Sequence, residues 1–157
     1  MTSLCCKVLK ALNGKTLVTA ESCTGGGIGA ALTAIPGSSE VYKGGVICYT
    51  NWVKYNVLGV DNKLLESEGA VSAPVAEAMA FGVRKLLQSD IAISVTGLAG
   101  PGMDDFGNPV GTVYIGYYDG QKNEVCECHF SGDRESVRRQ AIEAALNLIL
   151  QNNESGA

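Results

Sequence analysis

The chain has 157 residues, enough to bury one hydrophobic core without disulfides or metals, and we expect a single domain over residues 1–157. Hydrophobic residues make up 46% of the sequence and charged residues 18%, a composition that excludes a disordered protein. The net charge of −4 excludes a broadly basic surface, so nucleic acid is not an expected partner.

The sequence also lacks the signals of secretion and of membrane insertion. Its six cysteines contain no C-x-x-C pair and lack the spacing of a disulfide framework or a zinc site. The N-terminus has no apolar signal core, and no segment approaches the roughly 20 apolar residues of a membrane span. We therefore expect a cytoplasmic protein with reduced thiols and no membrane partner.

The first half of the chain alternates between helix and strand patterns. Apolar residues recur at helical spacing from Leu4 to Leu12, and Asn13-Gly14 ends that pattern. The elements expected next are a strand over Leu17–Thr19, a helix over Gly25–Leu32, a buried strand ending in Val46–Tyr49, and short helices over 51–58 and 62–68.

The second half predicts a long helix, a strand, a hairpin and a last helix. The long helix begins at Ser72 and places on one face Val75, Met79, Val83, Leu86 and Leu87. The later elements are a strand over Ile91–Val95, a hairpin of Val110–Tyr118 and Glu124–Phe130, a helix over Asp133–Gln151, and a frayed tail over 152–157. This order predicts a three-layer α/β/α sandwich with a mixed central sheet.

The stretch from Thr19 to Gly27 is the strongest candidate for a site, because an expected strand ends there and an expected helix begins. A helix N-terminus aims unpaired backbone N–H groups at whatever lies above it, and glycines let a ligand approach closely. Ser22 and Cys23 are the candidate nucleophiles of this stretch. The residues expected to bind a ligand there are Cys23, Thr24, Gly25 and Gly26.

A serine nucleophile needs a base, and the sequence offers two candidates. The only histidine, His129, lies late in the predicted hairpin, where a sheet side chain is favoured over a member of a Ser-His-Asp triad. Lys54 is expected in the first turn of a helix, where the macrodipole favours the neutral amine, although a solvated surface lysine fits the same spacing. Tyr49 is expected either to orient that lysine or relay a proton, or to be a partly buried core tyrosine.

Two further segments indicate ligand binding. Arg134, Arg138 and Arg139 lie at a helix N-terminus, where cations oppose the helix dipole unless they hold an anion or pair with nearby carboxylates. The glycine-rich loop from Thr96 to Gly102 leaves the end of a strand, where open α/β sheets bind their ligands. We therefore expect Thr96, Gly97 and Gly100 to line the site. Asp104-Asp105 fits a solvated turn better than a metal site.

Several motifs together resemble the CinA family, and more narrowly its C-terminal domain, the nicotinamide-nucleotide amidase. They are Thr19 to Gly26, Tyr49 to Lys54, Gly69 to Ser72, Val95 to Pro101, Pro109 to Val113, and Gly132 to Gln140. The motifs match in order along nearly the whole chain. The chain resembles the stand-alone form of the amidase, which lacks the N-terminal domain of larger members.

The resemblance implies hydrolysis of nicotinamide mononucleotide to nicotinate mononucleotide and ammonia, without a metal or a cofactor. It implies Ser22 as the nucleophile, Lys54 as its base, and Tyr49 or Lys54 as the donor of a proton to the leaving ammonia. Arg138 or Arg139 is then expected to bind the substrate phosphate, and the protein is expected to form a homo-oligomer, with a dimer favoured. The alternatives are a Cys23-based amidohydrolase and a module that binds the nucleotide without catalysis.

Overall fold

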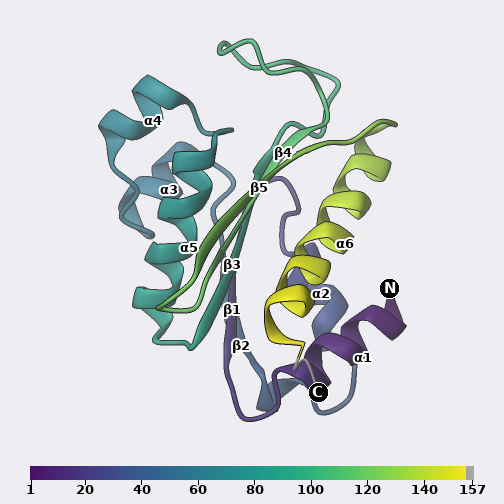
Figure 1. Cartoon of the computed structure of the whole chain (residues 1–157). Coiled ribbons are helices and arrows are strands. Elements are labelled where there is room, and N and C mark those ends of the chain that lie inside the picture. Colours follow the sequence, from purple (N-terminus) through teal and green to yellow (C-terminus); the bar gives the residue numbers. More distant parts are fainter. Residues whose placement is uncertain (155–157) are drawn as a thin grey trace.

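A five-stranded mixed sheet forms the centre of the computed structural model, which describes residues 1–154 (Figure 1). The strands are β1 (Leu17–Glu21), β2 (Tyr42–Ile47), β3 (Ile91–Gly97), β4 (Thr112–Tyr118) and β5 (Asn123–His129), in the spatial order β2-β1-β3-β4-β5. Strand β1 is parallel to both of its neighbours, whereas β3, β4 and β5 pair antiparallel. The predicted mixed sheet is therefore confirmed.

Helices cover both faces of this sheet, which confirms the predicted three-layer arrangement (Figure 1). One face carries α1 (Thr2–Ala11), α2 (Gly27–Thr33) and α6 (Arg134–Asn153), which contact one another. The other face carries α5 (Ala73–Leu87), joined by α3 (Asn51–Asn56) and α4 (Asn62–Glu68), while a short 3-10 turn spans Ser38–Glu40. No helix within residues 1–154 is long and apolar enough to cross a membrane.

Two apolar cores, one on each side of the sheet, hold the layers together. Strands β1 and β3 contribute side chains to both cores, because successive residues of a strand point to opposite faces of the sheet. All five residues of β1 are buried, which fits its central position between two parallel neighbours. The carboxyl end of β1 is thus fixed by packing from both faces.

Strand β2 differs from the expected buried strand. It is an edge strand paired only with β1, and its side chains are alternately half-buried and exposed. Ile47 is 56% exposed and Tyr49, just beyond the strand, 58% exposed. The expectation was wrong because β-branched and aromatic residues suit the exposed face of an edge strand as well as a buried strand.

Two element ends and the burial of one residue also differ from the expectations. Helix α2 begins at Gly27 rather than Gly25, because Gly25 and Gly26 adopt left-handed φ angles of 58° and 99°. Leu86, expected on the buried face of α5, is 48% exposed. The expected tail from residue 152 is corrected as well, since α6 continues to Asn153, whose amide donates to Ile149 O and Tyr117 Oη. Residues 155–157 lie outside the described residues.

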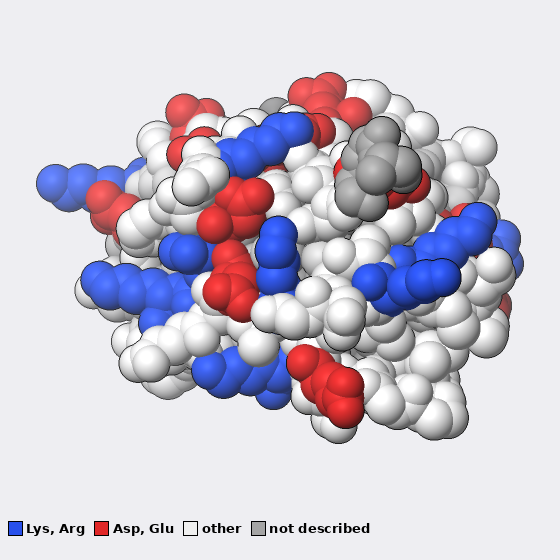
Figure 2. Space-filling view, turned by 60° about the horizontal axis from the view of Figure 1, so that its bottom comes forward, with Lys and Arg blue, Asp and Glu red and all other residues white. Residues whose placement is uncertain are grey.

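Charges of both signs are interspersed on the face that surrounds the two termini (Figure 2). Basic and acidic side chains both occur across this face (Figure 2). This distribution agrees with the small net charge of −4. Electrostatics therefore do not single out this face as an anion-binding or cation-binding surface.

Candidate active site

A cleft of about 350 Å³ lies at the carboxyl ends of β1 and β3, at the end of the sheet from which the β3–β4 loop projects (Figure 1). Open α/β sheets bind their ligands at this end of their parallel strands. The lining residues are Ser22, Cys23, Tyr49, Gly97, Leu98, Ala99, Gly100, Pro101, Gly102 and Arg134. The cleft therefore brings together the candidate nucleophiles, the tyrosine, the glycine-rich loop and one arginine.

Ser22 follows directly after β1 and is held there by the neighbouring strand. Its backbone N–H donates to Val95 O of β3 at 2.9 Å, and its carbonyl accepts from Gly25 N–H at 3.1 Å. The residue is 7% exposed, and that exposure opens into the cleft. Ser22 is thus fixed at both ends of its backbone with its side chain beside a ligand-sized space.

Lys54 lies against Ser22, with its amine Nζ 3.0 Å from Ser22 Oγ. The amine also donates to Cys48 O at 2.8 Å, and the whole residue is only 1% exposed. This position excludes the solvated surface lysine that the sequence also allowed. Helix α3 carries Lys54 inward from the sheet edge, and the N–H of Lys54 donates to Thr50 O in its first turn.

The surroundings of Lys54 favour its neutral form. No carboxylate lies within ion-pair distance of it among residues 1–154, where Lys122 pairs with Glu124 and the His129 ring contacts Glu127. Burial lowers the pKa of the Lys54 amine below its ordinary value of 10.5, against smaller opposing effects of Cys48 and Cys23. A buried amine with a lowered pKa beside a serine hydroxyl is the arrangement that general-base catalysis by lysine requires.

Glu21 stabilises the turn that carries Ser22, the candidate nucleophile. Its buried carboxylate accepts from Thr24 Oγ1 at 2.7 Å and from the N–H groups of Ile28 and Gly29 at 2.8 and 3.1 Å. A further bond comes from Thr19 Oγ1 at 3.2 Å. Glu21 therefore caps α2 from the preceding strand, in place of the capping side chain that Gly26 lacks.

Burial disfavours the thiolate form of the two cysteines near the site. Burial raises the pKa of Cys23 to about 11, although the charges of Arg138 and Lys54 oppose that shift. Burial also raises the pKa of Cys48 to about 11. A protonated thiol is a poor nucleophile, so the environment of Cys23 favours Ser22 over Cys23.

Arg134 spans the mouth of the cleft from the first residue of α6. Its Nη1 donates to Gly100 O, and its Nη2 donates to Tyr49 Oη at 3.0 Å. Arg134 and Tyr49 are both exposed, so the core tyrosine that the sequence also allowed is excluded. A guanidinium has five N–H donors, and the two used here leave others for an anion in the cleft.

The other two arginines of this helix do not line the cleft. Arg138 is half-buried, and it donates through Nε to Cys23 O at 3.0 Å and through Nη2 to Thr24 O at 3.1 Å. Arg139 is exposed on a different side of the helix. The prediction that one of these two binds phosphate is not tested by these contacts, and Arg134 is the arginine that lies in the cleft.

The remaining predicted residues fall into two groups. Gly97 and Gly100 line the cleft, whereas Gly25 and Gly26 shape the turn beneath it through their left-handed φ angles. Thr96 is buried and donates to Ala70 O at 2.8 Å, outside the lining of the cleft. Thr96 therefore joins β3 to the segment that precedes α5.

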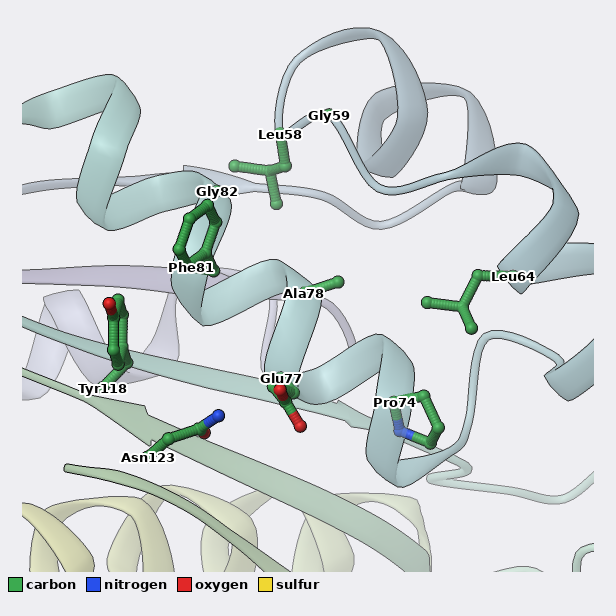
Figure 3. Close-up of a pocket in the computed structure, with 10 residues that line it drawn as sticks. All are labelled: Leu58, Gly59, Leu64, Pro74, Glu77, Ala78, Phe81, Gly82, Tyr118 and Asn123. Atoms are coloured by element: carbon green, nitrogen blue, oxygen red, sulfur yellow. The ribbon is translucent and has the colours of Figure 1, made fainter. Parts of the chain in front are cut away.

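A second hollow of about 360 Å³ lies on the α5 side of the sheet (Figure 3). Phe81 and Tyr118 stack at its edge with ring centroids 5.5 Å apart, and Glu77 is its only acidic residue. Tyr118 pairs with Ala92 near the start of β3, and the hollow shares no lining residue with the cleft beside Ser22. It contains neither a nucleophile nor a cationic side chain.

Two weaker candidates of the sequence lie outside the cleft. His129 is on the exposed strand β5, where its ring contacts Glu127 at 2.6 Å. Asp104 accepts from the N–H groups of Phe106 and Asn108, which makes it a turn-forming residue, and Asp105 is exposed. No group of histidine, cysteine or acidic residues within residues 1–154 has the arrangement of a metal site.

Three contributors to the site escaped sequence reasoning. Arg134 was grouped with its neighbours, although its spacing of four residues from Arg138 predicts a shared helix face. The role of Glu21 as a cap depends on a bond across seven residues to Ile28, which no local pattern reveals. The role of the Cys48 carbonyl as an acceptor for Lys54 leaves no trace in the sequence, because every residue has a backbone carbonyl.

Comparison with known proteins identifies relatives along nearly the whole chain. The family model "CinA C-terminal domain" matches residues 1–152. A "CinA-like protein" of Cyanothece sp. is 55% identical over 137 residues, which cover 86% of this chain and 33% of that protein. Another CinA-like protein, of Synechococcus sp., is 49% identical over 152 residues. These residues cover 94% of this chain and 36% of that protein. The chain thus spans about a third of the length of the curated relatives it matches.

Solved structures share the fold over their whole length. The competence damage-inducible protein A of Klebsiella pneumoniae superposes with a TM-score of 0.95 at 35% identity, covering 99% of this chain and 98% of that one. A competence/damage inducible protein of Agrobacterium tumefaciens gives a TM-score of 0.94 at 34% identity, covering 98% and 95%. These similarities agree with the single α/β domain described above.

Proposed function

Because the chain belongs to the CinA C-terminal domain family, we propose that it is an amidohydrolase that converts nicotinamide mononucleotide to nicotinate mononucleotide and ammonia. The observation that carries the proposal is the buried contact of 3.0 Å between Lys54 Nζ and Ser22 Oγ at the floor of a cleft. A serine beside a neutral amine is an activated nucleophile, and acyl transfer is its ordinary chemistry.

The first half of the reaction forms an acyl-enzyme. Ser22 Oγ attacks the carboxamide carbon while Lys54 Nζ accepts the hydroxyl proton. The negative charge that develops on the carboxamide oxygen is stabilised by backbone N–H groups of the turn after Ser22. Among residues 1–154, no carbonyl oxygen accepts the N–H of Cys23, which follows the nucleophile directly.

The second half releases both products. The ammonium of Lys54 returns its proton to the amide nitrogen, so that the C–N bond breaks and ammonia leaves. A water molecule then attacks the ester carbon, Lys54 accepts the water proton, and the Ser22–carbon bond breaks with return of that proton to Ser22. The proposal gives Tyr49 a supporting position at the cleft mouth, where it accepts a bond from Arg134.

The substrate phosphate is assigned to Arg134. This arginine lies in the cleft, is exposed, and keeps donors beyond the two that hold Gly100 O and Tyr49 Oη. A guanidinium binds phosphate through paired N–H donors, which suits this position. The glycine-rich loop opposite supplies backbone around the rest of the ligand. Self-association of the chain stays a prediction.

Ammonia release tests the proposal directly. Purified protein should release ammonia from nicotinamide mononucleotide faster than from nicotinamide riboside or free nicotinamide, because the latter two lack the phosphate. Ser22→Ala and Lys54→Ala should each lower kcat at least about a thousandfold, as removal of a nucleophile or its base does. Cys23→Ala should keep most of the activity.

Three outcomes would contradict the proposal. Loss of activity in Cys23→Ala with normal turnover by Ser22→Ala would make the thiol the nucleophile. Turnover of all three compounds at equal rates would remove the phosphate from recognition. Tight binding of nicotinamide mononucleotide by the wild-type protein without ammonia release would leave a binding module rather than an enzyme.

A further inference from the structure

Helix α6 contacts the catalytic end of the sheet through one stripe of side chains. Arg134, Arg138 and Ile142 are spaced by four residues and therefore share a face of the helix. Arg134 reaches Gly100 and Tyr49, and Arg138 reaches the turn after the nucleophile. Ile142 packs so closely on Gly27 that a Cβ there would collide with it. The stripe thus follows the nucleophile turn from the cleft to the start of α2.

Arg138 occupies the middle of this stripe and uses its donors on backbone oxygens. Its Nε donates to Cys23 O at 3.0 Å and its Nη2 to Thr24 O at 3.1 Å, across more than a hundred residues of sequence. These two carbonyls belong to the Cys23–Thr24 and Thr24–Gly25 peptide units, which follow the Ser22–Cys23 unit. A guanidinium binds both at once because its N–H donors lie in one rigid plane.

These bonds complete the set that fixes the turn. The N–H of Ser22 is bound to Val95 O, and the carbonyl of Ser22 to Gly25 N–H. Glu21 holds the far end through Thr24 Oγ1 and the first N–H groups of α2. Among residues 1–154, Arg138 is the only side chain that donates to the carbonyls of Cys23 or Thr24. Without it, among residues 1–154, the Cys23 carbonyl accepts no hydrogen bond, and the Thr24 carbonyl keeps only the bond from Gly27 N–H at 2.9 Å.

We propose that Arg138 is a positioning residue that holds the Cys23–Thr24 peptide units and thereby keeps Ser22 Oγ within reach of Lys54 Nζ. This inference rests on the proposed amidase function, and it departs from the expectation that Arg138 binds the substrate phosphate. Displacement of a reacting atom by about 1 Å can slow an enzymatic step about a hundredfold. The effect should therefore appear in the chemical step and not in substrate affinity.

Steady-state kinetics distinguishes the two roles. Arg138→Gln should lower kcat by about ten- to a hundredfold with little change in KM, whereas loss of a phosphate ligand should mainly raise KM. Arg138→Lys keeps the charge but not the planar pair of donors, so its kcat should lie between wild type and Arg138→Gln. Glu135→Gln, an exposed change on the same helix, serves as the control. A raised KM with unchanged kcat would overturn the inference.

Modification of Ser22 by phenylmethanesulfonyl fluoride tests the inference without the amide substrate. The serine oxygen replaces fluoride on sulfur and its proton passes to Lys54, and the reagent carries no phosphate. The rate measured by intact mass should fall about tenfold or more in Arg138→Gln and by an intermediate factor in Arg138→Lys, and Ser22→Ala should not react. Equal rates in wild type and Arg138→Lys, or an unreactive wild-type serine, would overturn the inference.

The two proposals can fail separately in these experiments. If the wild-type protein releases no ammonia but Arg138→Lys slows modification of Ser22, the amidase proposal fails and the positioning role stands. If ammonia is released and both Arg138 variants turn over normally, the positioning role fails alone. Thermal unfolding of each variant shows whether it is folded, and Arg138→Lys is the informative variant if Arg138→Gln does not fold.

Discussion

The floor and the mouth of the candidate cleft are built in opposite ways. The floor is formed by Ser22, and Glu21 and Lys54 lie beneath it; all three are buried and held by several hydrogen bonds. The mouth consists of Tyr49 and Arg134, which are exposed and bound mainly to each other and to Gly100. Under the proposed amidase function, the reacting atoms are held by buried contacts and recognition of the substrate falls to exposed side chains.

The largest effect is expected from a change beneath the floor. Glu21→Gln places an amide NH₂ among the N–H and O–H donors of Ile28, Gly29 and Thr24, which now bind a carboxylate. We expect the free energy of unfolding to fall by about 3 kcal/mol, since a buried charged acceptor is lost. Chemical denaturation measures this change.

The exposed residue Glu40 provides the matched control for Glu21. Glu40→Gln should change the free energy of unfolding by less than about 0.5 kcal/mol, as surface substitutions usually do. Equal stability of Glu21→Gln and Glu40→Gln would mean that the Glu21 carboxylate does not hold the turn after Ser22. The rigidity that distinguishes the floor from the mouth would then have another source.

The second prediction concerns the mouth, where the effect should be on binding and not on stability. Arg134→Gln should raise KM for nicotinamide mononucleotide by about ten- to a hundredfold with a small change in kcat, because a charged hydrogen bond to phosphate contributes to ground and transition states alike. Free nicotinamide, which lacks the phosphate, should show no such change. Initial-rate measurements of ammonia release provide both constants.

Arg139→Gln distinguishes phosphate binding by Arg134, which the cleft geometry supports, from phosphate binding by Arg139, which the sequence suggested. Arg139 is exposed and lies outside the lining of the cleft, so its removal should leave KM within about twofold of wild type. A large rise of KM in Arg139→Gln together with normal KM in Arg134→Gln would assign the phosphate to Arg139 and restore the first expectation.

The floor was also easier to predict from sequence than the mouth. The motif around Ser22 and the segment that carries Lys54 stand next to recognisable strand and helix boundaries, and the three-layer fold followed from the order of those elements. The contact between Ser22 and Lys54 crosses 32 positions, so the residues gave candidates and the structure supplied their distance. Sequence alone left open whether Lys54 was buried.

The parts that sequence did not predict depend on long-range packing. Strand β2 looked buried because apolar content does not reveal which strands lie at a sheet edge. The three arginines of α6 looked equivalent, yet Arg134 lies in the cleft, Arg138 lies against the nucleophile turn and Arg139 is exposed. Which of them meets the cleft depends on how α6 is rotated against the sheet, and that rotation is set by packing of buried residues such as Val137 and Ala141.

The third and smallest expected effect is a pH dependence that the buried Lys54 amine imposes on both stability and activity. Because burial lowers the pKa of Lys54 in the folded protein below 10.5, the unfolded chain binds one more proton between the two pKa values. Stability therefore rises with pH across that interval, by about 1.4 kcal/mol for each unit of difference, and is flat below the folded pKa. Lys54→Met removes this group, so the stability of wild type relative to Lys54→Met should increase as pH rises towards 10.5.

The same proton should control the reaction. The kcat/KM of wild type should rise with pH through the folded pKa of Lys54, because only the neutral amine accepts the proton of Ser22. The midpoint of that rise and the pH at which the stability difference begins to grow should coincide, as measured by initial rates and by denaturation at matched pH values. Lys63→Met, at an exposed position of α4, controls for the general loss of a lysine. Midpoints that differ by more than about one unit would show that a group other than Lys54 sets the rate, since one pKa governs both curves.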